Sequence, residues 1–269
     1  MVAMSSRDKT PQALTELLPA DLQRLRAACE KLEHPGLAAR LTALVGTPLD
    51  RAMEKLPDSL AESIQTAARS SIEKVMRLAL SSAPLGTPTG TSDRLHKAVA
   101  IGTGAVGGLF GLPGVVVELP VTTGVIMRSI ADIATQFGED PDSAETRLAC
   151  VEVFALGGPG SSDDAAESGY YGMRVALALE VTAVTRQSAS AMLGLVRAVA
   201  ARFGVVVTDK VALQFVPLVG ALGGAALNAV FMQHFQDMAR GHFEVRRLER
   251  KYGPEVVRKA YETIAASIR

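Results

Sequence analysis

Two apolar stretches, each interrupted by proline and glycine, constrain this fold more than any other feature of the sequence. The first runs from Ile101 to Met127, and Glu118 is its only ionisable residue. The second runs from Val211 to Met232, with Gln214 and Asn228 as its most polar members. Both are too long for strands, so they predict helices that are buried in a core or contact a bilayer.

The interruptions argue against helices that cross a membrane. The segment 111–114 (Gly-Leu-Pro-Gly) and Pro120 are expected to break the first stretch, and Pro217 the second. The remaining pieces are shorter than the roughly 20 residues that a spanning helix needs. The chain has no Trp, and none of its four Tyr flanks these stretches. Three arrangements stay open: a soluble fold that buries both stretches, a membrane-docked or partly inserted form, and a protein with two spans.

Helical periodicity recurs along the rest of the chain, and no alternating strand pattern is convincing. It covers residues 12–82, 143–156, 166–203, 227–251 and 254–268, and the last two segments are separated by Gly253-Pro254. We therefore predict an all-α fold, a compact multi-helix domain with two central Gly-rich apolar helical hairpins.

The domain division follows the change from amphipathic to apolar sequence. Residues 1–60 are interpreted as an N-terminal amphipathic helical extension, and residues 61–269 as the main all-helical domain. Residues 81–92, rich in Ser, Thr, Pro and Gly, have the composition of a linker. Asp21 follows a break at Pro19 and is expected to cap the next helix.

Glycines spaced four apart predict close helix contacts. A glycine inside a helix costs roughly 0.5–1 kcal/mol relative to alanine, and tight pairing of two glycine-bearing helices would offset that cost. The residues concerned are Gly104, Gly107, Gly108, Gly111, Gly220 and Gly224. Residues 102–107 match G-x-G-x-x-G but lack a preceding strand, so they do not indicate a dinucleotide site.

Glu118 is the most unusual ionisable residue because it lies in an apolar run before a proline. If buried, it needs a cation or several donors, and Arg128 is its expected partner beyond Pro120. The pair is interpreted as pinning two helices together. A proton-active or ligand-binding carboxylate, or an ordinary rim position, are the alternatives.

Three polar residues of the C-terminal part complete the candidate polar centre. Asn228 lies on an apolar face, where its amide can cap a helix or bridge to backbone, with a substrate contact as the alternative. His234 and His242 would need a further ligand to bind metal, and although Glu118 or Glu152 could supply one, no spacing requires it. We predict no metal and no cofactor. Glu118, His234 and His242 remain candidates for an enzyme of unknown reaction.

Charge is balanced overall but segregated along the chain. There are 28 basic and 28 acidic residues, which removes the electrostatic argument for nucleic acid. Residues 139–167 hold eight acids and one arginine (net −7), and residues 240–269 hold eight basic and four acidic residues (net +4). These are either solvated surfaces, or the basic tail meets an anionic surface such as membrane headgroups.

Compartment signals are few. Cys29 and Cys150 match no metal or redox spacing and are expected to be reduced, buried thiols. The first nine residues have no apolar run behind their charges, so we expect no secretory signal and a cytoplasmic location.

Several ordered blocks of this sequence resemble the EcsC protein family. The blocks lie at residues 107–114, 118–120, 128–131, 137–140, 147–157, 216–221, 224–228, 234, 239–243 and 246–253. The resemblance covers about residues 60–265. The family is named after the third gene of a bacterial operon that encodes an ABC transporter. Membership implies a helical protein without an assigned reaction, and membrane proximity or secretion by genomic association alone.

These observations predict a non-enzymatic module at or near the cytoplasmic membrane face, peripheral at its inner side, that binds lipid or an integral membrane protein. The alternatives are the enzyme described above and a soluble scaffold whose apolar helices stay buried. Nothing in the sequence indicates an oligomeric state.

Overall fold

Helices make up nearly all of the chain that the structure describes. The computed structural model describes residues 16–33, 37–45, 51, 53–54, 56–81, 112–156, 169–185, 189–214 and 220–268. Within these ranges every regular element is a helix and no strand occurs, which confirms the all-α prediction.

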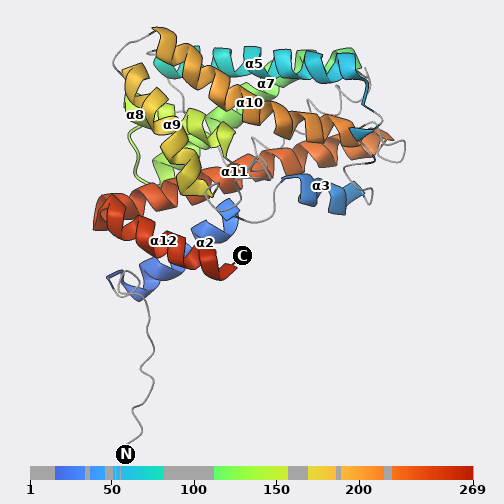
Figure 1. The fold of residues 1–269 in the computed structure, drawn as a ribbon. Helices are drawn as coiled ribbons and strands as arrows, with labels where there is room; N and C mark the ends of the chain where they lie inside the picture. Colours follow the sequence, from blue (N-terminus) through green and yellow to red (C-terminus); the bar gives the residue numbers. More distant parts are fainter. Residues whose placement is uncertain are drawn as a thin grey trace, which may run out of the picture.

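The long helix α11 (Gly220–Tyr252) is the centre of the arrangement. The helices α2 (Pro19–Glu33), α3 (Leu37–Val45) and α12 (Pro254–Ile268) pack against it. Figure 1 shows α2 and α12 below α11 and the remaining long helices above it. Helices from both ends of the sequence therefore share one side of α11.

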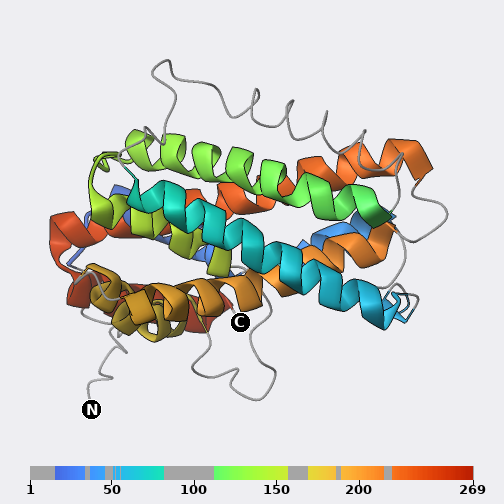
Figure 2. The same ribbon diagram turned by 90° about the horizontal axis from the view of Figure 1, so that it is seen from above.

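Three helices form a layer on the other side of α11. They are α5 (Asp58–Leu80), α7 (Leu112–Gln136) and α10 (Ala189–Gln214), and α5 packs against both of the others (Figure 2). The short helices α8 (Ala144–Glu152) and η1 (Val153–Ala155) and the helix α9 (Tyr170–Thr185) close one end. The short helix η1 contacts both α10 and α11, so it lies inside the molecule.

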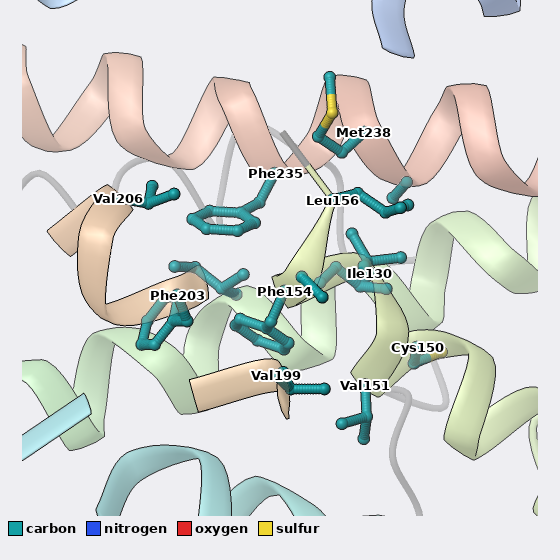
Figure 3. Packing of buried hydrophobic residues seen from close by; sticks show 14 of the residues in the cluster. Ile130, Cys150, Val151, Phe154, Leu156, Val199, Phe203, Val206, Phe235 and Met238 are labelled. Carbon is teal, nitrogen blue, oxygen red and sulfur yellow. The ribbon is translucent and has the colours of Figure 1, made fainter. Parts of the chain in front are cut away.

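A cluster of phenylalanine rings joins η1, α10 and α11 in the core. Phe154 lies 5.3 Å from Phe203 and 5.4 Å from Phe235 between ring centroids, with aliphatic side chains around them (Figure 3). Phe231 adds a further ring, 5.2 Å from Phe235. Because such pairs contribute about 0.5–1.5 kcal/mol beyond their buried area, this cluster helps to fix α10 against α11.

The predicted interruption at Pro120 is wrong. Helix α7 runs without a break from Leu112 to Gln136 and contains Pro120. Proline removes one backbone hydrogen bond, but the packed neighbours of α7 keep the helix continuous. Of the segment 111–114, residues 112–114 form the start of α7, where a missing N–H is harmless, and Gly111 lies outside the described residues.

The two predicted helix ends have different outcomes. Helix α11 ends at Tyr252, Gly253 has a φ of 87°, and α12 begins at Pro254, which confirms the predicted boundary. The predicted cap at Asp21 is wrong. Helix α2 begins at Pro19, so Asp21 lies within its first turn and its buried carboxylate contacts α11. A long-range ion pair has replaced the local cap.

A close helix contact occurs at Gly241. A Cβ there would lie 2.7 Å from Leu32 Cγ and 3.2 Å from the Ala28 carbonyl oxygen, so the glycine lets α2 approach α11. The predicted contact glycines lie elsewhere: Gly104, Gly107, Gly108 and Gly111 are outside the described residues. Gly220 and Gly224 are in the first turns of α11, but what surrounds them is not among the features that the structure describes. Pairing through those glycines stays a prediction.

One helix in the described part of the chain is long and apolar enough to cross a membrane. It is the segment Ala191–Ala212 of α10, with a mean hydropathy of 1.7. Of that window, 56% is buried inside the protein, as in the core helix of a soluble protein. By itself this helix is therefore weak evidence for a span.

Candidate functional site

Tyrosine, histidine and carboxylate side chains gather at the end of the molecule where α2, α9, α11 and α12 approach one another. His242 of α11 is fully buried, and its Nδ1 lies 2.9 Å from the hydroxyl oxygen of Tyr170. Its Nε2 lies 4.0 Å from a carboxylate oxygen of Glu152 and has no hydrogen-bond partner. With Tyr170 donating to Nδ1, the ring proton is on Nε2 and faces Glu152.

Three tyrosines pack on one another beside this histidine, which contacts one of them, Tyr170, and we call them the tyrosine cluster (Tyr170, Tyr171 and Tyr261). Their ring centroids are 5.2–5.3 Å apart. The Arg174 guanidinium lies 5.5 Å from the centroids of both Tyr170 and Tyr171. Glu249 accepts hydrogen bonds from Arg174 at 2.6 Å and from Tyr171 at 2.8 Å. The arginine charge is therefore balanced within the protein.

Burial disfavours the charged forms of the central groups of this site. It lowers the pKa of His242 well below the usual value, and nearby Arg174 and Arg246 act in the same direction. Burial also raises the pKa of Glu152, against the opposing charge of Arg174, and raises the pKa of Tyr170. Nε2 of His242, 4.0 Å from Glu152, is too far for a hydrogen bond, and the Tyr170 hydroxyl faces the fully buried histidine.

A cavity of about 560 Å³ lies on the outer side of the tyrosine cluster. Its lining includes all three tyrosines together with Glu33 of α2. One oxygen of Glu33 accepts a hydrogen bond from the Tyr261 hydroxyl at 2.9 Å and another from the Tyr170 backbone N–H at 3.2 Å. The volume is within the range of small-molecule sites.

Asp21 forms a second polar node, between α2 and α11. Its carboxylate accepts hydrogen bonds from Lys251 at 2.6 Å, from the Tyr252 hydroxyl at 2.8 Å and from Arg247 at 3.2 Å. The bonds from Lys251 and Tyr252 hold the pKa of Asp21 far below its usual range. This node ties the N-terminal helix to the end of α11.

The acidic segment and the basic tail contact each other, a pairing that the sequence analysis did not consider. Arg246 of α11 binds Glu139 at 3.0 Å and Glu145 at 2.9 Å, and Arg250 also binds Glu139. Burial opposes ionisation of Glu139, yet the hydrogen bonds from these arginines hold its pKa below the usual value. Part of the segregated charge is thus neutralised within the fold.

The two predicted histidines lie at different places. His234 is fully buried, and neither of its ring nitrogens has a hydrogen-bond partner. Burial lowers its pKa to about 4, and the Arg40 charge adds to this effect. Arg40 forms an ion pair with Asp237 at 2.8 Å, so His234 lies near α3 whereas His242 contacts α9.

The other predicted residues do not form a described site. The side chain of Glu118 is outside the described residues, and Arg128 is exposed on α7, so their pairing stays a prediction. Asn228 is buried on α11. Among the described residues no group of three His, Cys, Asp or Glu side chains could hold a metal ion.

Sequence reasoning missed the tyrosine cluster and Glu33. The available signal was compositional: the chain has only four tyrosines, two of them adjacent. Each one hydrogen-bonds to an acidic side chain or a histidine, and three of the four form the tyrosine cluster. The scarcity of tyrosine and the gathering of three of them mark this end as the candidate site.

Comparison with known proteins gives one result. The model of the EcsC protein family matches residues 9–248, a range that includes α2 and α3 as well as most of α11. No curated protein and no solved structure matches the chain. With most of its length matched by this family model, the chain belongs to the EcsC protein family.

Proposed function

We propose that this protein is a non-enzymatic module that docks on the cytoplasmic face of a membrane through the outer surface of α9 and α10. The observation that carries the proposal is the exposed stripe of α10. Leu193, Arg197, Ala201 and Val205 follow one another at intervals of four and all are exposed. An outer helix face normally carries charged residues of both signs, whereas this one is apolar with an arginine.

Helix α9 exposes further apolar residues next to α10. It packs on α10 and exposes Val175, Ala176 and Ala178, with Val175 62% exposed. We call the exposed residues of both helices the α9–α10 face (Val175, Ala176, Ala178, Leu193, Arg197, Ala201 and Val205). Exposed apolar residues grouped on neighbouring helices are typical of an interaction site. The arginine suits anionic headgroups, because its apolar stem can lie along the bilayer while its charge stays at the interface.

Docking on the surface fits α10 better than spanning the bilayer does. The opposite side of α10 carries core residues such as Val199 and Phe203, and Asp209 and Lys210 are buried near its end. Spanning would expose these charges to lipid or would require the core to come apart, at a high cost. A face-on contact leaves the fold intact.

Vesicle flotation tests the proposal. The full chain should float with vesicles of phosphatidylcholine and phosphatidylglycerol, and less with phosphatidylcholine alone or at high salt. The double variant Leu193→Glu, Val205→Glu should stay in the dense fraction. Leu80→Glu, at an exposed apolar residue of α5, is the matched control and should float. A wild-type protein that never floats, or a double variant that floats equally well, would refute docking through this face.

The family's genomic association with a transporter motivates a second arm with cell-derived membranes. Binding to these membranes without binding to protein-free vesicles would replace the lipid with an integral membrane protein as the partner. Loss of that binding in the same double variant would still assign the contact to the α9–α10 face.

A further inference from the structure

We propose that the α9–α10 face selects membrane lipids whose headgroup carries a primary ammonium group next to its phosphate, as the ethanolamine headgroup does. This inference rests on the proposed function and deepens it, because it names the lipid that the face prefers. Two residues of opposite charge carry it: Glu180 of α9 and Arg197 of α10.

The Glu180 carboxylate lies directly on α10. The three heavy atoms nearest to the Cβ that Gly194 lacks all belong to this carboxylate, with Cδ at 2.8 Å and Oε1 at 3.0 Å. Gly194 follows Leu193 of the face and precedes Arg197 by three residues, and Glu180 follows Ala176 by one helical turn. The glycine therefore seats a carboxylate at the junction of α9 and α10, next to residues of the face.

Neither of the two charges has a partner within the protein. In the part of the chain that the structure describes, Glu180 and Arg197 make no hydrogen bond, ion pair or ring contact. Arg197 is exposed and Glu180 is half-buried, so a ligand can reach both. The Cβ positions of residues three apart on a helix are about 5–6 Å from each other, so the seat at Gly194 adjoins Arg197. One small ligand that carries both charges can contact both residues.

This pair of charges distinguishes among common lipid headgroups. The Arg197 guanidinium suits the phosphate, whose oxygens accept its N–H groups. A purely anionic headgroup would satisfy Arg197 but would be repelled by Glu180. A choline nitrogen carries three methyl groups and no N–H, whereas a primary ammonium group offers three N–H donors to the carboxylate. The ethanolamine headgroup therefore satisfies both residues at once.

Vesicles that differ only in their zwitterionic lipid test this selection. Phosphatidylethanolamine or phosphatidylcholine is mixed with the same fraction of phosphatidylglycerol, so that the vesicles have equal net charge. In flotation, the full chain should partition onto the ethanolamine vesicles about fivefold more strongly, equivalent to about 1 kcal/mol, the upper end for an exposed ion pair.

Two variants should reduce this preference. Glu180→Gln removes the carboxylate charge but keeps the size of the side chain, and it should bind both kinds of vesicle equally. Gly194→Ala leaves the charge unchanged, but its Cβ displaces the carboxylate from its seat, and it should also lower the preference. Glu62→Gln, the same change at an exposed residue of α5, is the matched control and should keep the fivefold difference.

The outcomes separate this inference from the docking proposal. Membrane binding by apolar surfaces depends on lipid composition, so a preference that persists in Glu180→Gln would come from lipid packing and would overturn the role of the carboxylate. Equal binding of the wild type to both kinds of vesicle would overturn headgroup selection and leave docking intact. A wild type that binds neither would refute docking itself, and headgroup selection with it.

Discussion

His234 predicts a specific loss of stability in mild acid. The ring is fully buried, neither nitrogen has a hydrogen-bond partner, and burial lowers its pKa from 6.5 to about 4. Between these pH values His234 is therefore protonated in the unfolded chain but neutral in the folded chain. Stability contributed by the neutral imidazole is present above pH 6.5 and is lost as the pH falls through this window.

The magnitude follows from the two pKa values. The full shift corresponds to about 3 kcal/mol, and the part lost between pH 7.5 and pH 5 is about 2 kcal/mol. Replacing His234 by leucine should abolish this loss. It should also keep or increase stability at pH 7.5, because it removes a buried polar ring that makes no hydrogen bond.

Urea unfolding at pH 7.5 and pH 5, followed by circular dichroism, measures the difference between wild type and His234→Leu. Other titrating groups, His242 included, are present in both proteins and cancel in this comparison. Gln236→Leu is the matched control, since Gln236 is buried on the same helix but does not titrate. It should shift stability equally at both pH values. If the free energy of unfolding of wild type and His234→Leu changed equally with pH, the reasoning about this buried ring would be wrong.

Three further predictions concern stability, each measured by urea or thermal unfolding. Asp21→Ala should lower the free energy of unfolding by about 2 kcal/mol, because it removes a buried acceptor of several charged donors. Arg24→Ala, at an exposed partner of Asp21, should lower it by less than about 1 kcal/mol. Equal effects would contradict the node assigned to Asp21. Gly241→Ala should destabilise the protein by about 1–3 kcal/mol through overpacking. Gly124→Ala, where a Cβ meets nothing within 4 Å, should stabilise it by up to about 1 kcal/mol. An increase in stability at both sites would refute the tight contact at Gly241. Tyr170→Phe should cost about 1–2 kcal/mol by leaving a buried imidazole nitrogen without its donor, and an unchanged unfolding midpoint would argue against that bond.

Helix ends that result from the backbone preferences of glycine and proline could be predicted from the sequence. Gly253 can adopt a positive φ and Pro254 fits the first turn of a helix, so this boundary needed no knowledge of the fold. Pro120 carries the same kind of signal but lies within a packed layer, where α7 contacts α5 and α11 and continues through the proline. Asp21 has a local option as a cap and a tertiary option with Lys251, and the tertiary one prevails.

The candidate site could not be predicted from the sequence in the same way. Its hydrogen bonds join residues 72 positions apart in Tyr170 and His242 and 228 positions apart in Glu33 and Tyr261. No local periodicity encodes which helix ends meet. The charged segments were predictable only in part. Their opposite signs can be read from the sequence, but the pairing of Glu139 with Arg246 depends on α11 passing beside the end of α7.

The location of the tyrosines has an optical consequence. The chain contains no tryptophan, so its near-ultraviolet absorbance and intrinsic fluorescence come mainly from four phenols. Three of them form the tyrosine cluster, Tyr252 lies at the Asp21 node, and all four hydroxyl groups are hydrogen-bonded. The unlabelled protein therefore carries a spectroscopic reporter concentrated at the tyrosine cluster beside the cavity. Its tyrosine difference absorbance should change with events at this cluster or at the Asp21 node. It should not change with events confined to the ends of α5 and α7 that lie farthest from both.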